Sequence, residues 1–405
     1  MFISSRAKEI SESVTLKLNA RATELADEGK KIYNLTAGQL PFKPDQRLVD
    51  QIANETNFLK SFQYSPVPGF PSLRKKIIKY VEESRDITFD GQDIDAIISN
   101  GGKHSLSVAL SAIVDPGDEV IIVAPYWISY PAMIKLYGGI PVVINSSIFD
   151  NFEPSLDDIK KAISEKTRAI IINSPQNPSG THYRPEWMEK FAEMMTKYPD
   201  LTILTDEIYY TLCYYDPKPT YFYQFKPELL KQTLIFDGIS KSFACTGLRI
   251  GFTIGPSKVI KAMGRLQGQT SSGANSLVQR ALDNFDFNHV DEYLKPIKEH
   301  LRANATILRD AFREANMSNV WYQTASAFYF LLDFDQCPIM NKYRKGPEDN
   351  EDYAAPICEE ILNELGVAIV PSSDFGVKNA ARISLVNEPG PFKEAITLLL
   401  KYIAG

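Results

Sequence analysis

Cysteine, histidine and tryptophan are scarce in this sequence. Its 405 residues include 4 cysteines, 4 histidines and 3 tryptophans. The cysteines lie far apart and form no Cys-x-x-Cys pair; they are Cys213, Cys245, Cys337 and Cys358. This spacing indicates neither a metal site nor a disulfide framework. We therefore expect no metal and a reducing, cytoplasmic setting.

A long hydrophobic run and an excess of positive charge are also absent. No apolar stretch approaches the ~20 residues that a membrane-spanning helix needs. Residues 1–20 show no apolar core behind a basic end, so no signal peptide is expected. Lysine and arginine number 44 against 50 aspartate and glutamate, a net charge of -6. This balance argues against nucleic acid or an anionic membrane surface as the main partner.

The chain does contain short β-rich runs that alternate with longer amphipathic runs. Its length predicts two domains, or one large domain with a smaller cap. The pattern favours an α/β fold with a mainly parallel sheet and helices on both faces, followed by a smaller α+β domain. Strands are predicted at residues 95–99, 118–124, 168–174, 201–206, 233–238 and 249–255.

The predicted division has three segments. Residues 1–45 form an N-terminal arm that is part of the small domain, residues 46–295 form the large domain, and residues 296–405 form the small C-terminal domain. The last segment begins with one long helical pattern, and "AFYFLLDF", "GVAIVP" and "ARISLV" follow as strands. We expect the N-terminal "KIYNLTAG" to pack with them.

Glycines and polar residues follow four of the predicted strands. The segments are "NGGKHSL", "SPQNPSG", "DEIYY" and "GISK". Ligands bind at the carboxyl ends of strands in parallel sheets, and glycines that open a helix let backbone N–H groups approach a phosphate. Each residue alone has an ordinary structural explanation: Asp206 as a helix cap, Tyr209 as core, Lys241 as a solvated lysine and Arg249 as half of an ion pair.

Together these residues fit one cofactor, pyridoxal 5′-phosphate. Lys241 supplies the amine for a Schiff base, and Asp206 supplies a carboxylate beside the ring nitrogen so that the ring can withdraw electrons. Tyr209 or Asn177 supplies a donor at the phenolic oxygen. Arg249, with the glycines, supplies positive charge and amides for the phosphate.

The motifs resemble those of class I aminotransferases of pyridoxal-phosphate fold type I, and most closely the bacterial-type aspartate aminotransferase branch. The resemblance covers nearly the whole chain, and the motifs follow in the family's order: "YSPVPGFPSLR", "NGGKHSL", "DPGDEVIIVAPYWISYP", "NSPQNPSG", "TDEIYY", "GISKSFACTGLRIG" and "ARISL". It implies a homodimer with shared active sites. It also implies transamination, most simply of L-aspartate with 2-oxoglutarate to oxaloacetate and L-glutamate.

The resemblance implies three catalytic residues, Lys241, Asp206 and Tyr209. Lys241 would hold the cofactor and move the proton at the substrate Cα, and Asp206 would pair with the ring nitrogen. Tyr209 and Asn177 would bond the phenolic oxygen, and Trp127 would stack on the ring.

The resemblance also implies a phosphate site and a substrate site. The phosphate would contact Gly101, Gly102, Lys103, Ser240 and Arg249, and Tyr64 would reach it from the neighbouring subunit. Gly38 and Arg382 would hold the substrate α-carboxylate, beside Asn177 and Trp127. Lys103 opens a helix, where the dipole disfavours a cation unless an anion is present, so it would bind the distal carboxylate of a dicarboxylic substrate.

Two segments depart from the family's pattern. "GQLPF" at residues 38–42 stands where the family usually reads Gly-Glu-Pro-Asp-Phe, and "TASAFY" at residues 324–329 stands for Pro-x-Gly-Ala-Phe-Tyr. These departures predict changed side chains, Leu40 and Ser326, on the small-domain side of the cleft. They leave the choice of substrate open.

Other functions on the same fold remain open. An aminotransferase for aromatic, prephenate-like or alanine substrates, or a lyase, would share Arg382, and only Lys103 argues against these. Prephenate-using members carry a basic residue near positions 11–13, where this chain reads "SES". A DNA-binding regulator built on the fold is disfavoured because the resemblance begins within the first twenty residues. A catalytically silent homologue is disfavoured because Lys241, Asp206 and Arg382 are intact.

Overall fold

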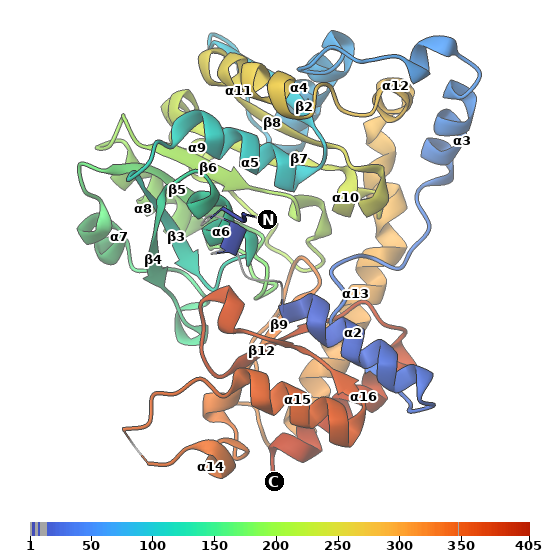
Figure 1. Cartoon of the computed structure of the whole chain (residues 1–405), viewed down its shortest axis with the longest axis vertical. Helices are drawn as coiled ribbons and strands as arrows, with labels where there is room; N and C mark the ends of the chain where they lie inside the picture. The colour runs from blue at the N-terminus through green and yellow to red at the C-terminus, as the bar shows by residue number, and fades with distance from the viewer. Residues whose placement is uncertain (1, 5–6, 9–13, 347) are drawn as a thin grey trace.

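A seven-stranded sheet forms the centre of the larger part of the molecule (Figure 1). The computed structural model describes residues 2–4, 7–8, 14–346 and 348–405. The strands, in their order across the sheet, are β2 (Ile94–Ser99), β8 (Gly251–Pro256), β7 (Thr233–Gly238), β6 (Thr202–Asp206), β5 (Thr167–Asn173), β3 (Glu119–Ala124) and β4 (Ile140–Asn145). The central strands are rich in β-branched residues and buried on both faces, as is typical of a covered parallel sheet.

The prediction of a mainly parallel sheet is confirmed, with one correction. Strands β4, β3, β5, β6 and β7 pair in parallel, whereas β8 runs antiparallel to both β7 and β2. Residues 249–255 were expected to form another parallel strand. The chain turns back directly after β7 without crossing to the opposite edge of the sheet, so β8 starts where β7 ends. Edge strand β4 was not predicted, although its first five residues are apolar; it contains Pro141, a residue that sheets tolerate mainly in edge strands.

Helices flank this sheet (Figure 1). They are α4 (Pro71–Arg85), α5 (Gly102–Ile113), α6 (Ser129–Leu136), α7 (Leu156–Ala162), α8 (Pro185–Met195), α9 (Phe222–Phe225), α10 (Ile239–Ser242), α11 (Ser257–Thr270) and α12 (Ser276–Asn284). Helix α3 (Gln46–Glu55) lies farther out and packs against α12. Among all helices in the described part of the chain, none is long and apolar enough to cross a membrane.

The smaller part is built around two small sheets. One is antiparallel, in the order β11 (Val370–Pro371), β12 (Ala380–Ser384) and β9 (Tyr329–Asp333). The other pairs β1 (Tyr33–Asn34) in parallel with β10 (Val367–Ala368), so the N-terminal segment packs with the C-terminal one as expected. The predicted strand "GVAIVP" is divided between the two sheets. The helices here are α2 (Val14–Asp27), α14 (Met340–Tyr343), α15 (Ala354–Leu365) and α16 (Pro389–Ile403).

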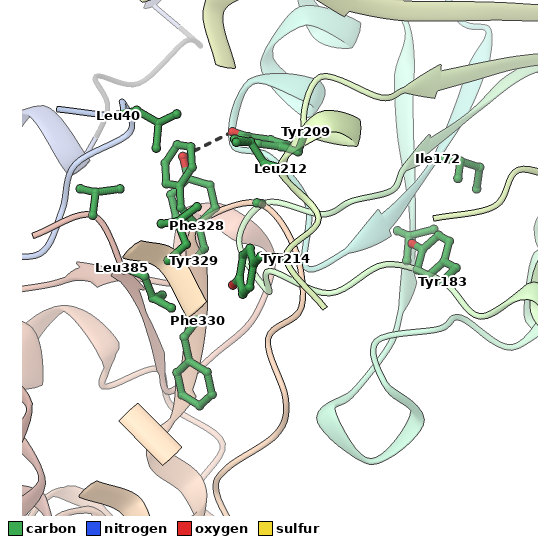
Figure 2. Packing of buried hydrophobic residues seen from close by; sticks show 14 of the residues in the cluster. Leu40, Ile172, Tyr183, Tyr209, Leu212, Tyr214, Phe328, Tyr329, Phe330 and Leu385 are labelled. Carbon is green, nitrogen blue, oxygen red and sulfur yellow. Dashed lines mark hydrogen bonds between the residues drawn. The ribbon is translucent and has the colours of Figure 1, made fainter. Parts of the chain in front are cut away.

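Helix α13 (Val290–Glu314) runs from one part of the molecule to the other (Figure 1). Its buried apolar residues recur every three or four positions, so one face packs on the core. The predicted boundary between residues 295 and 296 falls within this helix, and the domain limits stay predictions. The core itself is continuous across the two parts: Tyr209, Tyr329 and Leu385 belong to one buried cluster (Figure 2).

Candidate active site

A cavity of about 810 Å³ lies at the carboxyl ends of the parallel strands, beside the smaller part. Strand β6 ends at Asp206 in its wall, and β7 leads directly into α10, which carries Lys241. Eleven of the predicted site residues line it: Gly38, Gly102, Lys103, Trp127, Asn177, Asp206, Tyr209, Ser240, Lys241, Arg249 and Arg382. Gly101 is buried directly beside Gly102, at the N-cap of α5.

The amine of Lys241 is a half-buried nucleophile with a lowered pKa. Its Nζ donates a hydrogen bond to the carbonyl oxygen of Gly38 at 2.5 Å. Burial lowers the pKa of Lys241 to about 8, helped by the positive charges of Arg382 and Arg249 and opposed by Asp206. A substantial fraction of this amine is therefore neutral near pH 8 and can attack an aldehyde or accept a proton.

Asp206 is a buried carboxylate at the end of β6. The hydroxyl of Tyr130 donates to its Oδ2 at 2.5 Å, and the backbone N–H of Ile208 donates to its Oδ1 at 3.4 Å. Burial raises the pKa of Asp206 to about 6, although both hydrogen bonds favour the ionised form. A cation placed beside this carboxylate would relieve the cost of its burial.

Two tyrosines, an asparagine and an arginine that line the cavity form a network. The hydroxyl groups of Tyr209 and Tyr329 lie 3.3 Å apart (Figure 2), and Asn177 Nδ2 donates to the Tyr209 hydroxyl at 3.5 Å. Arg382 is buried and donates to Asn177 Oδ1 at 3.1 Å and to the carbonyl oxygen of Thr36 at 3.0 Å. Its Nε has no hydrogen-bond partner within the described residues, so a donor remains unsatisfied there.

A tight backbone cradle lies at the N-terminus of α5. A Cβ on Gly101, whose φ is +88°, would lie 2.5 Å from a terminal nitrogen of Arg249. A Cβ on Gly251 would lie 2.4 Å from the backbone nitrogen of Gly102. Arg249 itself has a left-handed φ of 55°, which costs a non-glycine residue about 1–2 kcal/mol. Strained backbone and close approach at a helix N-terminus are features of an anion site.

Lys103 stands in the first turn of α5 and lies near an aromatic ring of the cavity wall. Its Nζ lies 5.0 Å from the ring centroid of Trp127, within the range of a cation–π contact. Burial lowers the pKa of Lys103, and the positive charge of Arg249 adds to that effect. A neighbouring anion would stabilise this ammonium group.

The charges of the cavity wall fit the cofactor that the sequence predicts. Among the described lining residues, five are cationic and two are carboxylates, namely Lys103, Lys135, Lys241, Arg249 and Arg382 against Asp206 and Asp374. The excess suits a phosphate and the carboxylates of a substrate. The unsatisfied Arg382 Nε and the backbone cradle at α5 provide donors for such groups.

Tyr64 is the predicted residue that lies apart from the cavity. Its side chain is 94% exposed, after the short helix η1 (Leu59–Phe62), and it does not line the cavity. Large apolar side chains are exposed beside it, including Leu59 and Phe62. Residues 11–13, where a basic residue was sought, lie outside the described residues.

Leu40 and Ser326, the two changed side chains in the segments that depart from the family's pattern, do not line the cavity. Leu40 is buried in the hydrophobic core (Figure 2). Ser326 is fully buried, and its hydroxyl lies 3.3 Å from Nδ1 of His182. Gln39 is exposed instead, and its Oε1 accepts a hydrogen bond from Thr246 at 3.0 Å. Burial, which a motif comparison does not reveal, decides this outcome.

The sequence reasoning missed several residues of the site, among them Tyr130, Asn173, Tyr329 and Lys135. Asn173 ends β5, donates to the backbone oxygen of Asp206 at 2.9 Å and accepts from the backbone nitrogen of Asn177 at 3.0 Å. Its place at a strand end was a usable signal. Tyr130 and Lys135 both lie on α6, and only tertiary packing brings Tyr130 to Asp206 and Lys135 to the cavity.

Comparison with known proteins agrees with this geometry. Residues 30–396 match the family described as aminotransferase class I and II. An aspartate/prephenate aminotransferase from Nitrosomonas europaea is 33% identical over 98% of each chain, and an aspartate aminotransferase from Geobacillus stearothermophilus is 31% identical over 100% of this chain and 99% of its own. The solved aspartate aminotransferase of Thermus thermophilus with maleate matches 99% of each chain at 28% identity, with a TM-score of 0.88. The chain therefore belongs to the class I and II aminotransferases and is an enzyme that uses pyridoxal 5′-phosphate.

Proposed function

We propose that this enzyme transfers the amino group of L-aspartate to 2-oxoglutarate, giving oxaloacetate and L-glutamate. One observation carries the proposal: Lys103 and Arg382, two cations on separate elements, line the same cavity as Lys241 and Asp206. A dicarboxylic substrate needs an anchor for each carboxylate. The names of the relatives from Geobacillus stearothermophilus and Thermus thermophilus support the same substrate class.

The binding roles follow from the chemistry of each side chain. When bound, pyridoxal phosphate supplies an aldehyde for covalent capture of an amino group and an electron-withdrawing ring. Asp206 would pair with the ring nitrogen, and Tyr209 and Asn177, which line the same cavity, would donate to the phenolic oxygen. Trp127 covers the ring. The phosphate is bound by Arg249 and by the residues at the N-termini of α5 and α10, namely Gly101, Gly102, Lys103 and Ser240.

Lys241 is the residue that transfers the proton. Its Nζ would hold the cofactor through the aldehyde, and as a neutral amine it would accept the proton from the substrate Cα. Arg382 holds the α-carboxylate with the Gly38 backbone, and its positive charge helps to lower the pKa of Lys241. Lys103 holds the distal carboxylate. Orientation by these two anchors keeps the Cα proton within reach of Nζ.

A homodimer with shared sites is part of the proposal. Tyr64 is highly exposed beside the exposed Leu59 and Phe62, and a second copy of the chain would cover such an apolar surface. Tyr64 then donates to the phosphate of the neighbouring subunit's cofactor.

Prephenate-like oxo acids are a second candidate acceptor class. The Nitrosomonas europaea relative is named aspartate/prephenate aminotransferase, and a cavity of about 810 Å³ is spacious for a four-carbon dicarboxylate beside the cofactor. Both classes carry two carboxylates, so both use Lys103 and Arg382.

A donor screen tests the reaction. The purified enzyme with pyridoxal phosphate should show the visible absorption band of the lysine-bound cofactor. Aspartate and glutamate should abolish this band and produce the pyridoxamine form, whereas alanine and phenylalanine should do so far more slowly. A band that resists every amino donor would contradict the proposed reaction.

Replacing Lys103 tests the substrate class. Lys103→Ala should lower kcat/KM for aspartate about 100-fold, because it leaves one carboxylate unpaired, and should change the value for alanine less than about fivefold. The comparison of the two substrates within one variant controls for damage to the cofactor site. Equal losses would show that Lys103 does not select dicarboxylates.

A further inference from the structure

We propose that Arg85 is a positioning residue of this active site: its guanidinium ties the ends of β6 and β7 together and thereby sets the position of Lys241 relative to Asp206. This inference rests on the proposed function for the roles of Lys241 and Asp206. Arg85 itself does not line the cavity.

The contacts of Arg85 join two neighbouring strand ends. Its Nε donates to Oε2 of Glu207 at 3.1 Å, and its Nη2 donates to Oδ2 of Asp237 at 2.6 Å. Glu207 directly follows Asp206, and Asp237 stands four residues before Lys241. One buried guanidinium at the end of α4 thus bonds to both of the chain segments that carry Asp206 and Lys241.

The second carboxylate oxygens of Asp237 and Glu207 bond to further groups near the two strand ends. Asp237 Oδ1 accepts from the backbone nitrogen of Gly238 at 2.7 Å, directly before the helix α10 that carries Lys241. Glu207 Oε1 accepts from the hydroxyl of Tyr223 at 2.8 Å and from that of Thr205 at 3.0 Å. The guanidinium therefore acts on the start of α10 through a single carboxylate.

The orientation of Arg85 is constrained from other sides as well. Its side chain is fully buried, its Cζ lies 3.9 Å from the ring centroid of Tyr210, and its Nη1 donates to the Ser84 hydroxyl at 2.8 Å. A planar fork with five donors can hold two carboxylates at a fixed angle, whereas a lysine ammonium cannot.

The charges of this cluster are unusual for a group that only fills the core. One buried cation faces two buried carboxylates, and burial raises the pKa of Glu207 to about 7 and also raises that of Asp237. Buried ion pairs contribute little net stability compared with apolar residues of similar volume. A role in fixing geometry explains why charged groups stand at these two strand ends.

Two variants test the proposal. Arg85→Lys keeps the buried charge but cannot hold both carboxylates at once. The triple variant Arg85→Met, Glu207→Gln, Asp237→Asn removes all three charges together, so no unpaired buried charge remains, and an amide oxygen at position 237 can still accept from Gly238. Arg184→Met is a control for the loss of an arginine–carboxylate pair away from the cavity: Arg184, whose side chain is 64% exposed, pairs with the buried Glu153 at 2.5 Å, and neither residue lines the cavity.

Two measurements are made on each variant: steady-state kcat and KM, and the rate at which the cofactor-free chain captures added pyridoxal phosphate on Lys241. We expect kcat to fall about 10-fold in Arg85→Lys and about 100-fold in the triple variant, with KM within about threefold, because misplacement of a catalytic group by about 1 Å costs this much. The capture rate should fall by about 10-fold or more in both. Arg184→Met should retain wild-type values.

The outcomes separate the two proposals. A folded triple variant or Arg85→Lys enzyme with wild-type kcat and capture rate would reduce Arg85 to a structural residue and overturn the inference. If the triple variant does not fold, Arg85→Lys alone decides, since it retains the buried cation. If the wild-type enzyme transaminates no amino acid, the proposed reaction fails, while the capture rate still tests the positioning role.

Discussion

The pKa of the Lys241 amine, about 8, places its change of charge within the working range of an enzyme. A lysine in water has a pKa of about 10.4, so burial and two nearby arginines account for the difference. The same residue was identified from its place after a strand end. Its pKa is lowered first by burial and then by Arg382, which lies 141 positions away in the chain.

The pH dependence of cofactor capture follows from this value. The neutral amine is the nucleophile, so the rate at which the cofactor-free enzyme captures pyridoxal phosphate should rise about tenfold per pH unit below about pH 8 and then level off. Stopped-flow absorbance measures this rate. Free Nα-acetyl-lysine, which keeps its side-chain amine, is the control, and its rate of reaction with pyridoxal phosphate should keep rising to about pH 10. A protein profile that follows the free amine would contradict a lowered pKa.

The ionised carboxylate of Asp206, which the proposed function needs, lowers the stability of the fold, and stability measurements can detect this. Its folded pKa of about 6 exceeds its ordinary value, so the fold favours the protonated carboxyl, and stability is lost as the pH rises through about 6. Asp206→Asn should therefore stabilise the cofactor-free protein at about pH 7.5 by on the order of 2 kcal/mol, and the gain should fade near pH 4.5.

Thermal unfolding of the cofactor-free Asp206→Asn and wild-type proteins at the two pH values checks this expectation. The amide oxygen can still accept from the Tyr130 hydroxyl, so the packing behind the residue is preserved. Transamination should nevertheless be nearly lost. A lower melting temperature for the variant at neutral pH would show that the carboxylate stabilises the empty fold.

At the scale of elements, the cradle at the N-terminus of α5 depends on close approach between two segments of the chain. A Cβ at Gly251 would collide with the backbone nitrogen of Gly102, whereas a Cβ at Gly247 would meet nothing within 4 Å. The two glycines flank Arg249 in "GLRIG", so they form a matched pair.

Gly251→Ala should separate β8 from α5 and weaken the affinity for pyridoxal phosphate at least about tenfold, or 1.4 kcal/mol. Gly247→Ala should leave the affinity unchanged. Quenching of tryptophan fluorescence in the cofactor-free enzyme measures both dissociation constants. Equal affinities in the two variants would mean that the cradle tolerates an added methyl group and is not a tight anion site.

The order of elements was predictable because apolar periodicity is local in the chain. The runs that form β3, β5 and β6 contain contiguous apolar residues, most of them β-branched, and α13 shows its buried face in its own spacing. The direction of β8 was predicted incorrectly, because a strand's sequence does not encode which way its neighbours run. Strand β4 was missed although its first five residues are apolar; Pro141 interrupts the strand pattern, and proline is tolerated in an edge strand.

For the whole molecule, the main expectation is a homodimer in which Tyr64 of one subunit reaches the active site of the other. If Tyr64 acts across a dimer, a mixture of Lys241→Ala chains with Tyr64→Ala chains should recover activity, because the mixed dimer has one site with both native residues. Random pairing of equal amounts should give about a quarter of the wild-type activity. Activity measured after unfolding and refolding the two variants together checks this, and each variant refolded alone is the control. No recovery would place Tyr64 outside its neighbour's site.

The sequence by itself determined the cofactor and the fold class. The residues that hold pyridoxal phosphate follow successive strands, and the carboxyl ends of parallel strands meet at one edge, so their order along the chain already implied their proximity. Only the tertiary structure decided the electrostatic state of the site and the surroundings of Leu40 and Ser326, where the sequence departs from the family's pattern. The pKa values of Lys241 and Asp206, the contact from Tyr130, the burial of Leu40 and the bridge made by Arg85 all depend on which distant segments exclude water from a given side chain. Desolvation and charge pairing act through space, and the linear chain does not record those distances.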